Sequence, residues 1–128
     1  MNAEEMKLRT KKFSLRVIRL VESLPVSKTG SVIGHQLLRS ATSVGANYRS
    51  ACRARSRADF LSKIGICIEE ADESLFWMEL LVETNLVSEI NLSDLMKETD
   101  ELIAILTASA ITVRNKLRKG QLNDQPCN

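Results

Sequence analysis

The sequence predicts an all-α domain, an up-and-down antiparallel four-helix bundle, and three observations lead to this prediction. Apolar residues recur at three- and four-residue steps through four long segments, which is the spacing of one face of a helix. Only five Gly and two Pro interrupt the 128 residues. Aromatic residues are few and aliphatic residues many, a balance that favours packed helices over a β-sandwich.

The length and the ends of the chain indicate its organisation. A chain of 128 residues suits one domain with one core, and we assign residues 1–120 to the bundle and 121–128 to a flexible C-terminal tail. The longest uncharged run, residues 102–113, is too short to cross a bilayer. The N-terminus has no apolar core of signal-peptide type, so we expect a cytoplasmic protein without membrane contact.

The first two helices are delimited by a loop rich in Pro, Gly and hydroxyl side chains. We expect a helix over about residues 4–24, which Pro25 ends. A second helix should follow over about residues 31–54. The residues available to cap it are Ser27, Thr29 and Ser31.

The third and fourth helices have signals of their own. The motif Ser-Arg-Ala-Asp at 56–59 fits a capping box and predicts a helix to about residue 83. Asn91 or Ser93 could cap the fourth helix, which should end at about residue 119, before Gly120. Connections this short force neighbouring helices to run antiparallel.

A polar stripe runs beside the apolar seam of the second helix. Small residues there would let a neighbouring helix approach closely, and polar groups could form hydrogen bonds across the contact. The alternative is that the polar side chains of the stripe simply face water. Phe76 and Trp77 indicate an apolar patch that a partner subunit would cover. The predicted packing or oligomer residues are Gln36, Arg39, Ser40, Ser43, Asn47, Phe76 and Trp77.

Residues for common catalytic chemistry are missing from the sequence. His35 is the only histidine, and the three cysteines lack the spacing of a metal site. The segment 30–34 has neither the Lys nor the preceding strand of a phosphate-binding loop. We therefore expect no enzyme activity, no metal, no cofactor and no disulfide.

Charge is segregated along the chain, although the net charge is only +2. Residues 1–63 carry 13 Lys and Arg against four acids, residues 64–113 carry one Lys against 11 acids, and residues 114–128 carry four basic residues against one acid. Clustered guanidinium groups grip phosphate oxygens in pairs, and a nearby tyrosine could stack on an unpaired base. We therefore predict binding of RNA or DNA. The predicted binding residues are Arg49, Arg53, Arg55, Arg57, Lys63 and Tyr48.

A second interpretation gives these arginines a structural role in a protein-interaction or scaffold module. They would then pair with acids of the third helix, which are Glu69, Glu70, Asp72 and Glu73. Against this interpretation, basic residues near both chain ends would add positive charge without acidic partners. Those at the N-terminal end are Lys7, Arg9, Lys11 and Lys12.

The segment QLLRSATSVGANYRSACRARSRADFLSKIGICIEEADESLFWMELL resembles bacterial four-helix-bundle proteins encoded in intervening sequences of 23S ribosomal RNA genes. The residues that carry the resemblance are Gln36, Arg39, Ser40, Ala41, Ser43, Val44, Ala46, Asn47, Arg57, Phe60 and the run from Glu70 to Trp77. It covers about Phe13 to Leu117. Many members have Glu-Gly two residues after the asparagine, where this chain has Ser50 and Ala51.

The resemblance implies an assembly and partners as well as a fold. It implies a homopentameric ring without enzyme activity. The sequence also looks related to accessory proteins of diversity-generating retroelements, which bind nucleic acid and a reverse transcriptase. From the resemblance we therefore expect a homo-oligomer, with a partner protein such as a reverse transcriptase.

Overall fold

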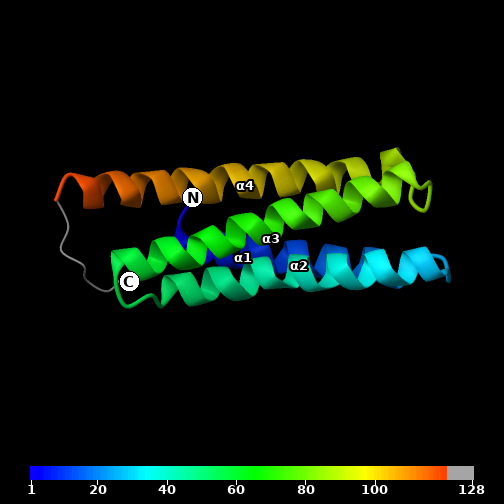
Figure 1. Cartoon of the computed structure of the whole chain (residues 1–128), viewed down its shortest axis with the longest axis horizontal. Coiled ribbons are helices and arrows are strands. Elements are labelled where there is room, and N and C mark those ends of the chain that lie inside the picture. Colours follow the sequence, from blue (N-terminus) through cyan, green and yellow to red (C-terminus); the bar gives the residue numbers. More distant parts are fainter. Residues whose placement is uncertain (121–128) are drawn as a thin grey trace.

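The computed structural model describes residues 1–120, and they form four α-helices without a strand. The helices are α1 (Ala3–Glu22), α2 (Lys28–Cys52), α3 (Arg57–Glu83) and α4 (Glu89–Arg118). They run alternately up and down along one long axis (Figure 1). This confirms the predicted bundle, whereas the ring of five copies stays a prediction. Residues 121–128, assigned to a tail from the sequence, lie outside the described residues.

Three serines begin helices as caps. Ser27, one of the three caps that the sequence allows for α2, accepts a hydrogen bond from the backbone N–H of Gly30. Ser56 accepts one from the backbone N–H of Asp59 at 3.0 Å, as the sequence predicted. The prediction for α4 is wrong, because Ser88 and neither Asn91 nor Ser93 caps it. Ser88 is extended, so its hydroxyl reaches the N–H of Asn91, three residues on.

The helix ends follow backbone restrictions. The first helix stops at Glu22, two residues earlier than predicted. Leu24 precedes Pro25, and a residue in that position is disfavoured in helical conformation. Gly120 has a φ of 63°, the left-handed conformation that glycine adopts after a helix, as predicted.

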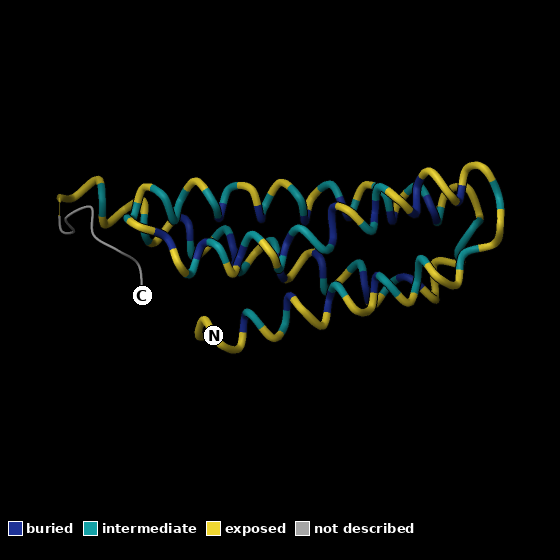
Figure 2. The backbone as a smooth tube through the Cα atoms, turned by 90° about the horizontal axis from the view of Figure 1, so that it is seen from below, coloured by how far each residue is buried: buried dark blue, intermediate teal, exposed yellow. Residues whose placement is uncertain are grey.

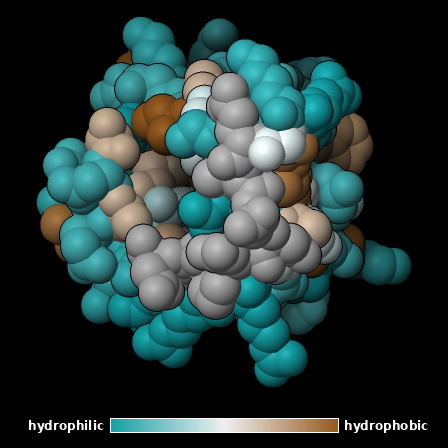
Figure 3. All heavy atoms as spheres, turned by 90° about the vertical axis from the view of Figure 1, so that its left-hand side faces the viewer, coloured by the Kyte–Doolittle hydropathy of each residue, from teal (hydrophilic) through white to brown (hydrophobic). Residues whose placement is uncertain are grey.

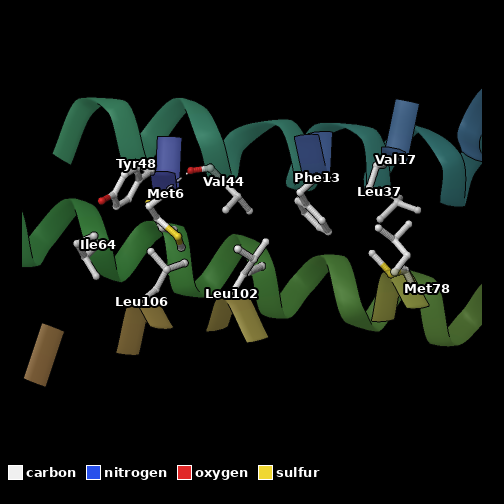
Figure 4. Packing of buried hydrophobic residues seen from close by; sticks show 14 of the residues in the cluster. Met6, Phe13, Val17, Leu37, Val44, Tyr48, Ile64, Met78, Leu102 and Leu106 are labelled. Carbon is white, nitrogen blue, oxygen red and sulfur yellow. Dashed lines mark hydrogen bonds between the residues drawn. The ribbon is translucent and has the colours of Figure 1, made fainter. Parts of the chain in front are cut away.

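The core lies along the axis between all four helices. Figure 4 shows Phe13 of α1, Leu37 and Val44 of α2, Met78 of α3 and Leu102 of α4 facing one another in it. Each is almost completely buried. Burial of such side chains is the main source of stability in a bundle.

The helix α1 is held mainly by a single neighbour. It packs along α2 but contacts α4 only sparsely, and towards its N-terminus it diverges from the other helices (Figure 2). Its contact with α2 is close, since a Cβ added to Gly45 would lie 3.4 Å from the Thr10 hydroxyl. Towards the divergent end an apolar hollow of about 330 Å³ opens between α1 and α4, beside Met6 and Leu106.

Candidate nucleic-acid interface

The bundle topology gathers the basic segments at one end. There α1 and α3 begin while α2 and α4 end, on the left of Figure 1. Residues 1–12, 45–66 and 108–120, which we call the basic end, hold 13 of the 18 Lys and Arg residues and three of the 16 acids. Residues 13–44 and 67–107 hold five basic residues and 12 acids. Segregation along the sequence thus becomes segregation along the bundle axis.

The rim of this end face is largely hydrophilic. Figure 3 looks along the axis at this end, and hydrophilic side chains lie around its rim. The described part of the chain has no helix that is both long and apolar enough to cross a membrane. The visible rim of the basic end is polar, as an interface for a charged ligand requires.

A groove between α1 and α2 brings together cations that are far apart in the sequence. It measures about 190 Å³, and we call it the α1–α2 groove. Lys7 and Lys11 lie one helical turn apart on α1, and Arg49 comes from α2. The remaining lining residues are Ser14, Gly45 and Ala46. Sequence reasoning grouped Arg49 with its neighbours in the chain and missed this association, because it depends on how α1 and α2 cross.

The other predicted basic residues surround the turn between α2 and α3. Arg53 and Arg55 are exposed, and Arg57 is partly buried. Lys63 lies one turn into α3, where it donates to Asp59 at 3.2 Å. None of the ion pairs within residues 1–120 involves Arg49, Arg53 or Arg55.

Tyr48 does not belong to this surface, and the predicted stacking role is wrong. Its side chain is only 8% exposed, because position 48 continues the apolar stripe of α2 through Val44. Figure 4 shows its ring beside Met6 inside the bundle. Burial raises the pKa of the Tyr48 phenol far above its ordinary value.

Two cations of α1 already have acidic partners. Arg9 donates from Nε and Nη2 to both carboxylate oxygens of Glu98, at 2.8 and 2.7 Å, and from Nη2 to Glu101 at 2.9 Å. Hydrogen bonds to these carboxylates raise the pKa of the guanidinium. Lys7 bonds Glu4 at 3.1 Å. The expectation that Arg9 lacks an acidic partner is therefore wrong, since α4 presents two acids one turn apart.

The acids of α3 are engaged by a different arginine. Arg39 of α2 pairs with Glu70 at 3.1 Å and also with Glu73, and it donates to Gln36 within its own helix. Trp77 donates to the same Glu73 carboxylate from Nε1. The predicted structural pairing of α2 with α3 acids therefore exists in this chain, but Arg39 makes it.

The polar stripe of α2 is partly buried against α3. Ser40 and Ser74 are completely buried, and their hydroxyl oxygens lie 2.8 Å apart. Ser43 and Asn47 bond within α2, through the carbonyls of Arg39 and Ser43 respectively. Ser40 thus contacts the neighbouring helix, whereas Ser43 and Asn47 lie at the edge of the contact.

The aromatic pair on α3 lies at the surface. Phe76 is 50% exposed, and its ring packs edge to face against Trp77 with the centroids 5.0 Å apart. Trp77 is partly buried, and its ring packs against the core. This geometry leaves one face of Phe76 for contact with another molecule.

The described residues form no cluster of metal-ligating groups. Within residues 1–120 no three His, Cys, Asp or Glu side chains lie close enough to hold a metal ion. Cys52 and Cys67 are free thiols, and burial raises the pKa of Cys67 to about 12. Cys127 lies outside the described part of the chain.

Comparison with known proteins agrees with the fold. The family model for the 23S rRNA-intervening sequence protein matches residues 5–108. A crystal structure of a protein with unknown function from the S23 ribosomal protein family of Bacteroides thetaiotaomicron superposes with a TM-score of 0.80. It is 33% identical, and the match covers 86% of this chain and 98% of that one. Among curated proteins none matches. Because the family model spans most of its length, the chain belongs to the 23S rRNA-intervening sequence protein family.

Proposed function

We propose that this protein is a non-catalytic, homo-oligomeric helical bundle that binds nucleic acid, RNA foremost, through its basic end. The observation that carries the proposal is the solvent-accessible placement of Arg49, Arg53 and Arg55, which no ion pair within residues 1–120 involves. Charged groups held at one end of a bundle attract a polyanion and orient it during encounter. Their guanidinium groups match phosphate oxygens in geometry.

The placement of the aromatic residues defines the expected mode of binding. Tyr48 is buried, and Phe60, the other aromatic residue of the basic end, is partly buried. Stacking on bases therefore contributes little, and contacts to the phosphate backbone dominate. Such contacts do not read the base sequence of the nucleic acid directly, and their strength falls steeply as the salt concentration rises.

The rival function is a protein-interaction module in which the arginines serve as salt-bridge donors. Within this chain that role falls to Arg39, which engages Glu70 and Glu73. Arg49, Arg53 and Arg55 make no ion pair within residues 1–120 and are available to an external partner. A polyanion fits a surface that gathers so many cations and so few acids.

Exposed apolar side chains support the homo-oligomer in this proposal. Leu8 and Leu15 lie seven residues apart on one face of α1 and are 54% and 41% exposed. Phe76 adds a half-exposed ring on α3. Self-association would bury these groups, and the resemblance to intervening-sequence proteins favours five copies. Light scattering should give a mass five times that of the 14.3 kDa chain, and a monomer mass would contradict the ring.

The partner protein follows from the resemblance alone. A reverse transcriptase is the partner to test, since accessory proteins of diversity-generating retroelements bind one. The cytoplasm of a bacterium is the expected location. Co-purification of the two tagged proteins would test the pairing, and separate elution at every salt concentration would contradict it.

Filter binding of labelled RNA tests the proposed function. We expect the Arg49→Gln/Arg53→Gln variant to bind at least about tenfold more weakly than the wild type, because two cations no longer reach the phosphates. The matched control is Arg16→Gln/Arg19→Gln, which removes two exposed arginines outside the basic end. Absence of RNA binding, or equal losses in the two variants, would contradict the proposal.

A further inference from the structure

We propose that the α1–α2 groove is a binding site for a single phosphate or pyrophosphate group. Lys7, Lys11 and Arg49 would bind the group, and Gly45 and Ala46 form the floor of the groove. The inference deepens the proposed function and rests on it, because it assigns one phosphate of the bound nucleic acid to a defined place. The groove also suits a free oligophosphate, which shares this chemistry.

The shape of the groove follows from the small residues of α2. Gly45 lets α1 pack closely at Thr10, and Ala46 is exposed beside it, so no long side chain fills the space between the helices. About 190 Å³ is left. That volume exceeds the roughly 30 Å³ that one water occupies in the liquid, so the groove accommodates a hydrated anion.

Two of the three cations around the groove have no acidic partner within residues 1–120. Lys11 and Arg49 are exposed, and none of the ion pairs in residues 1–120 involves either. Lys7 bonds Glu4, whose side chain is 84% exposed, so that pair is weak and exchangeable. Lys7 and Lys11 are like charges one turn apart, an arrangement that costs stability unless an anion lies between them.

The donors that remain for an anion are the ammonium and guanidinium groups. The Ser14 hydroxyl is already directed to the carbonyl oxygens of Thr10 and Ala41, at 3.2 and 3.4 Å. Arg9, the next cation on α1, is held by Glu98 of α4, away from the groove. The three-cation arrangement is therefore specific to this groove and is not a general property of α1.

Two variants test the groove by different means. Ala46→Leu fills the floor without changing charge, and a helical position open to solvent tolerates leucine well. Lys11→Gln removes one cation and leaves the shape. The matched controls are Ala104→Leu and Lys97→Gln, both on α4 outside the basic end. Circular dichroism melting of all four variants establishes that they fold.

Pyrophosphate titration followed by ¹⁵N TROSY spectra is the direct measurement. We expect saturable shifts of the Gly45 and Ala46 amide signals, with binding at least about tenfold weaker in Ala46→Leu and Lys11→Gln and unchanged in the controls. Shifts that do not saturate, or equal binding by the groove variants and their controls, would overturn the inference.

Binding of a short RNA duplex to the same variants separates this inference from the proposed function. We expect Ala46→Leu to weaken RNA binding about tenfold relative to Ala104→Leu. RNA binding that is equal in the two variants would refute the groove and leave the basic end as the binding surface. Saturable pyrophosphate binding without any RNA binding would refute the proposed function and leave the groove as a site for free oligophosphates.

Discussion

Ser40 is completely buried between α2 and α3, and its hydroxyl can donate either to the Ser74 hydroxyl or to the carbonyl of Leu37. Both hydroxyl groups are therefore satisfied without water. The sequence is compatible with a polar stripe that faces water and with one that faces a neighbouring helix. In the structure Ser40 faces the neighbouring helix α3. The sequence alone does not distinguish the two environments, because hydroxyl side chains suit both.

Ser40→Leu should destabilise the protein by about 1–3 kcal/mol, since a larger side chain must fit into a filled interface and the hydroxyl pair is removed. Urea unfolding followed by circular dichroism measures the change. Ser31→Leu is the control, because Ser31 is exposed on the same helix and its replacement should stay within about 0.5 kcal/mol. A Ser40 variant as stable as the wild type would show that this interface is loosely packed.

Glycines give a second prediction at the scale of single residues. A Cβ added to Gly65 meets no atom within 4 Å, so Gly65→Ala should stabilise α3 by about 0.5–1 kcal/mol. Gly30→Ala should destabilise the protein, because its Cβ would lie 2.8 Å from Ser27 Oγ and 3.1 Å from the carbonyl oxygen of Pro25. Thermal melting of both variants measures the opposite shifts. Shifts of the same sign would contradict this account.

The helices themselves were largely predictable, because their signals are local in sequence. The Ser56 cap and the Asp59 amide are three residues apart, and Gly120 ends α4 through its own backbone conformation. The start of α4 was mispredicted, because several residues near it can cap and the turn before it decides which does. Asn85, with a φ of 62°, shapes that turn and leaves Ser88 in position.

The first turn of α3 gives a pH-dependent prediction. Bonds from the Arg55 backbone N–H and from Lys63 lower the pKa of Asp59. A carboxyl group whose folded pKa is lowered contributes stability above its unfolded pKa, about 3.9, and loses it as the pH falls through the folded value. Asp59→Asn should therefore melt below the wild type at pH 7, and the gap should close in acid. Asp72→Asn, exposed on the same helix, is the control, and a gap independent of pH would contradict the assignment.

The attachment of α1 to α4 depends on a few contacts. Arg9 joins the two helices through Glu98 and Glu101, and the side chains of Arg9 and Glu98 are 23% and 17% exposed. Arg9→Met should cost about 1.5–3 kcal/mol and increase amide hydrogen exchange in α1 above that in α3. Arg16→Met removes an exposed arginine of α1 and should leave exchange nearly unchanged. Equal exchange in the two variants would mean that α2 alone holds α1.

At the scale of the whole molecule, topology converts charge blocks along the chain into a basic end and an acidic remainder. The antiparallel order predicted from the short loops implies this outcome. The α1–α2 groove could not be predicted, because the meeting of Lys7 and Lys11 with Arg49 depends on the crossing of two helices. Tyr48 was misplaced for a related reason: its phenol suits a surface or a core, and the stripe through Val44 takes it inward.

The salt dependence of RNA binding tests the central claim most directly. The logarithm of the binding constant should fall linearly with the logarithm of salt concentration, as expected when basic residues displace counterions from phosphates. In Arg49→Gln/Arg53→Gln the slope should be shallower by roughly 0.7–0.9 for each phosphate that is no longer neutralised, while Arg16→Gln/Arg19→Gln should keep the wild-type slope. Binding that is insensitive to salt, or the same slope in all three proteins, would contradict binding through the basic end.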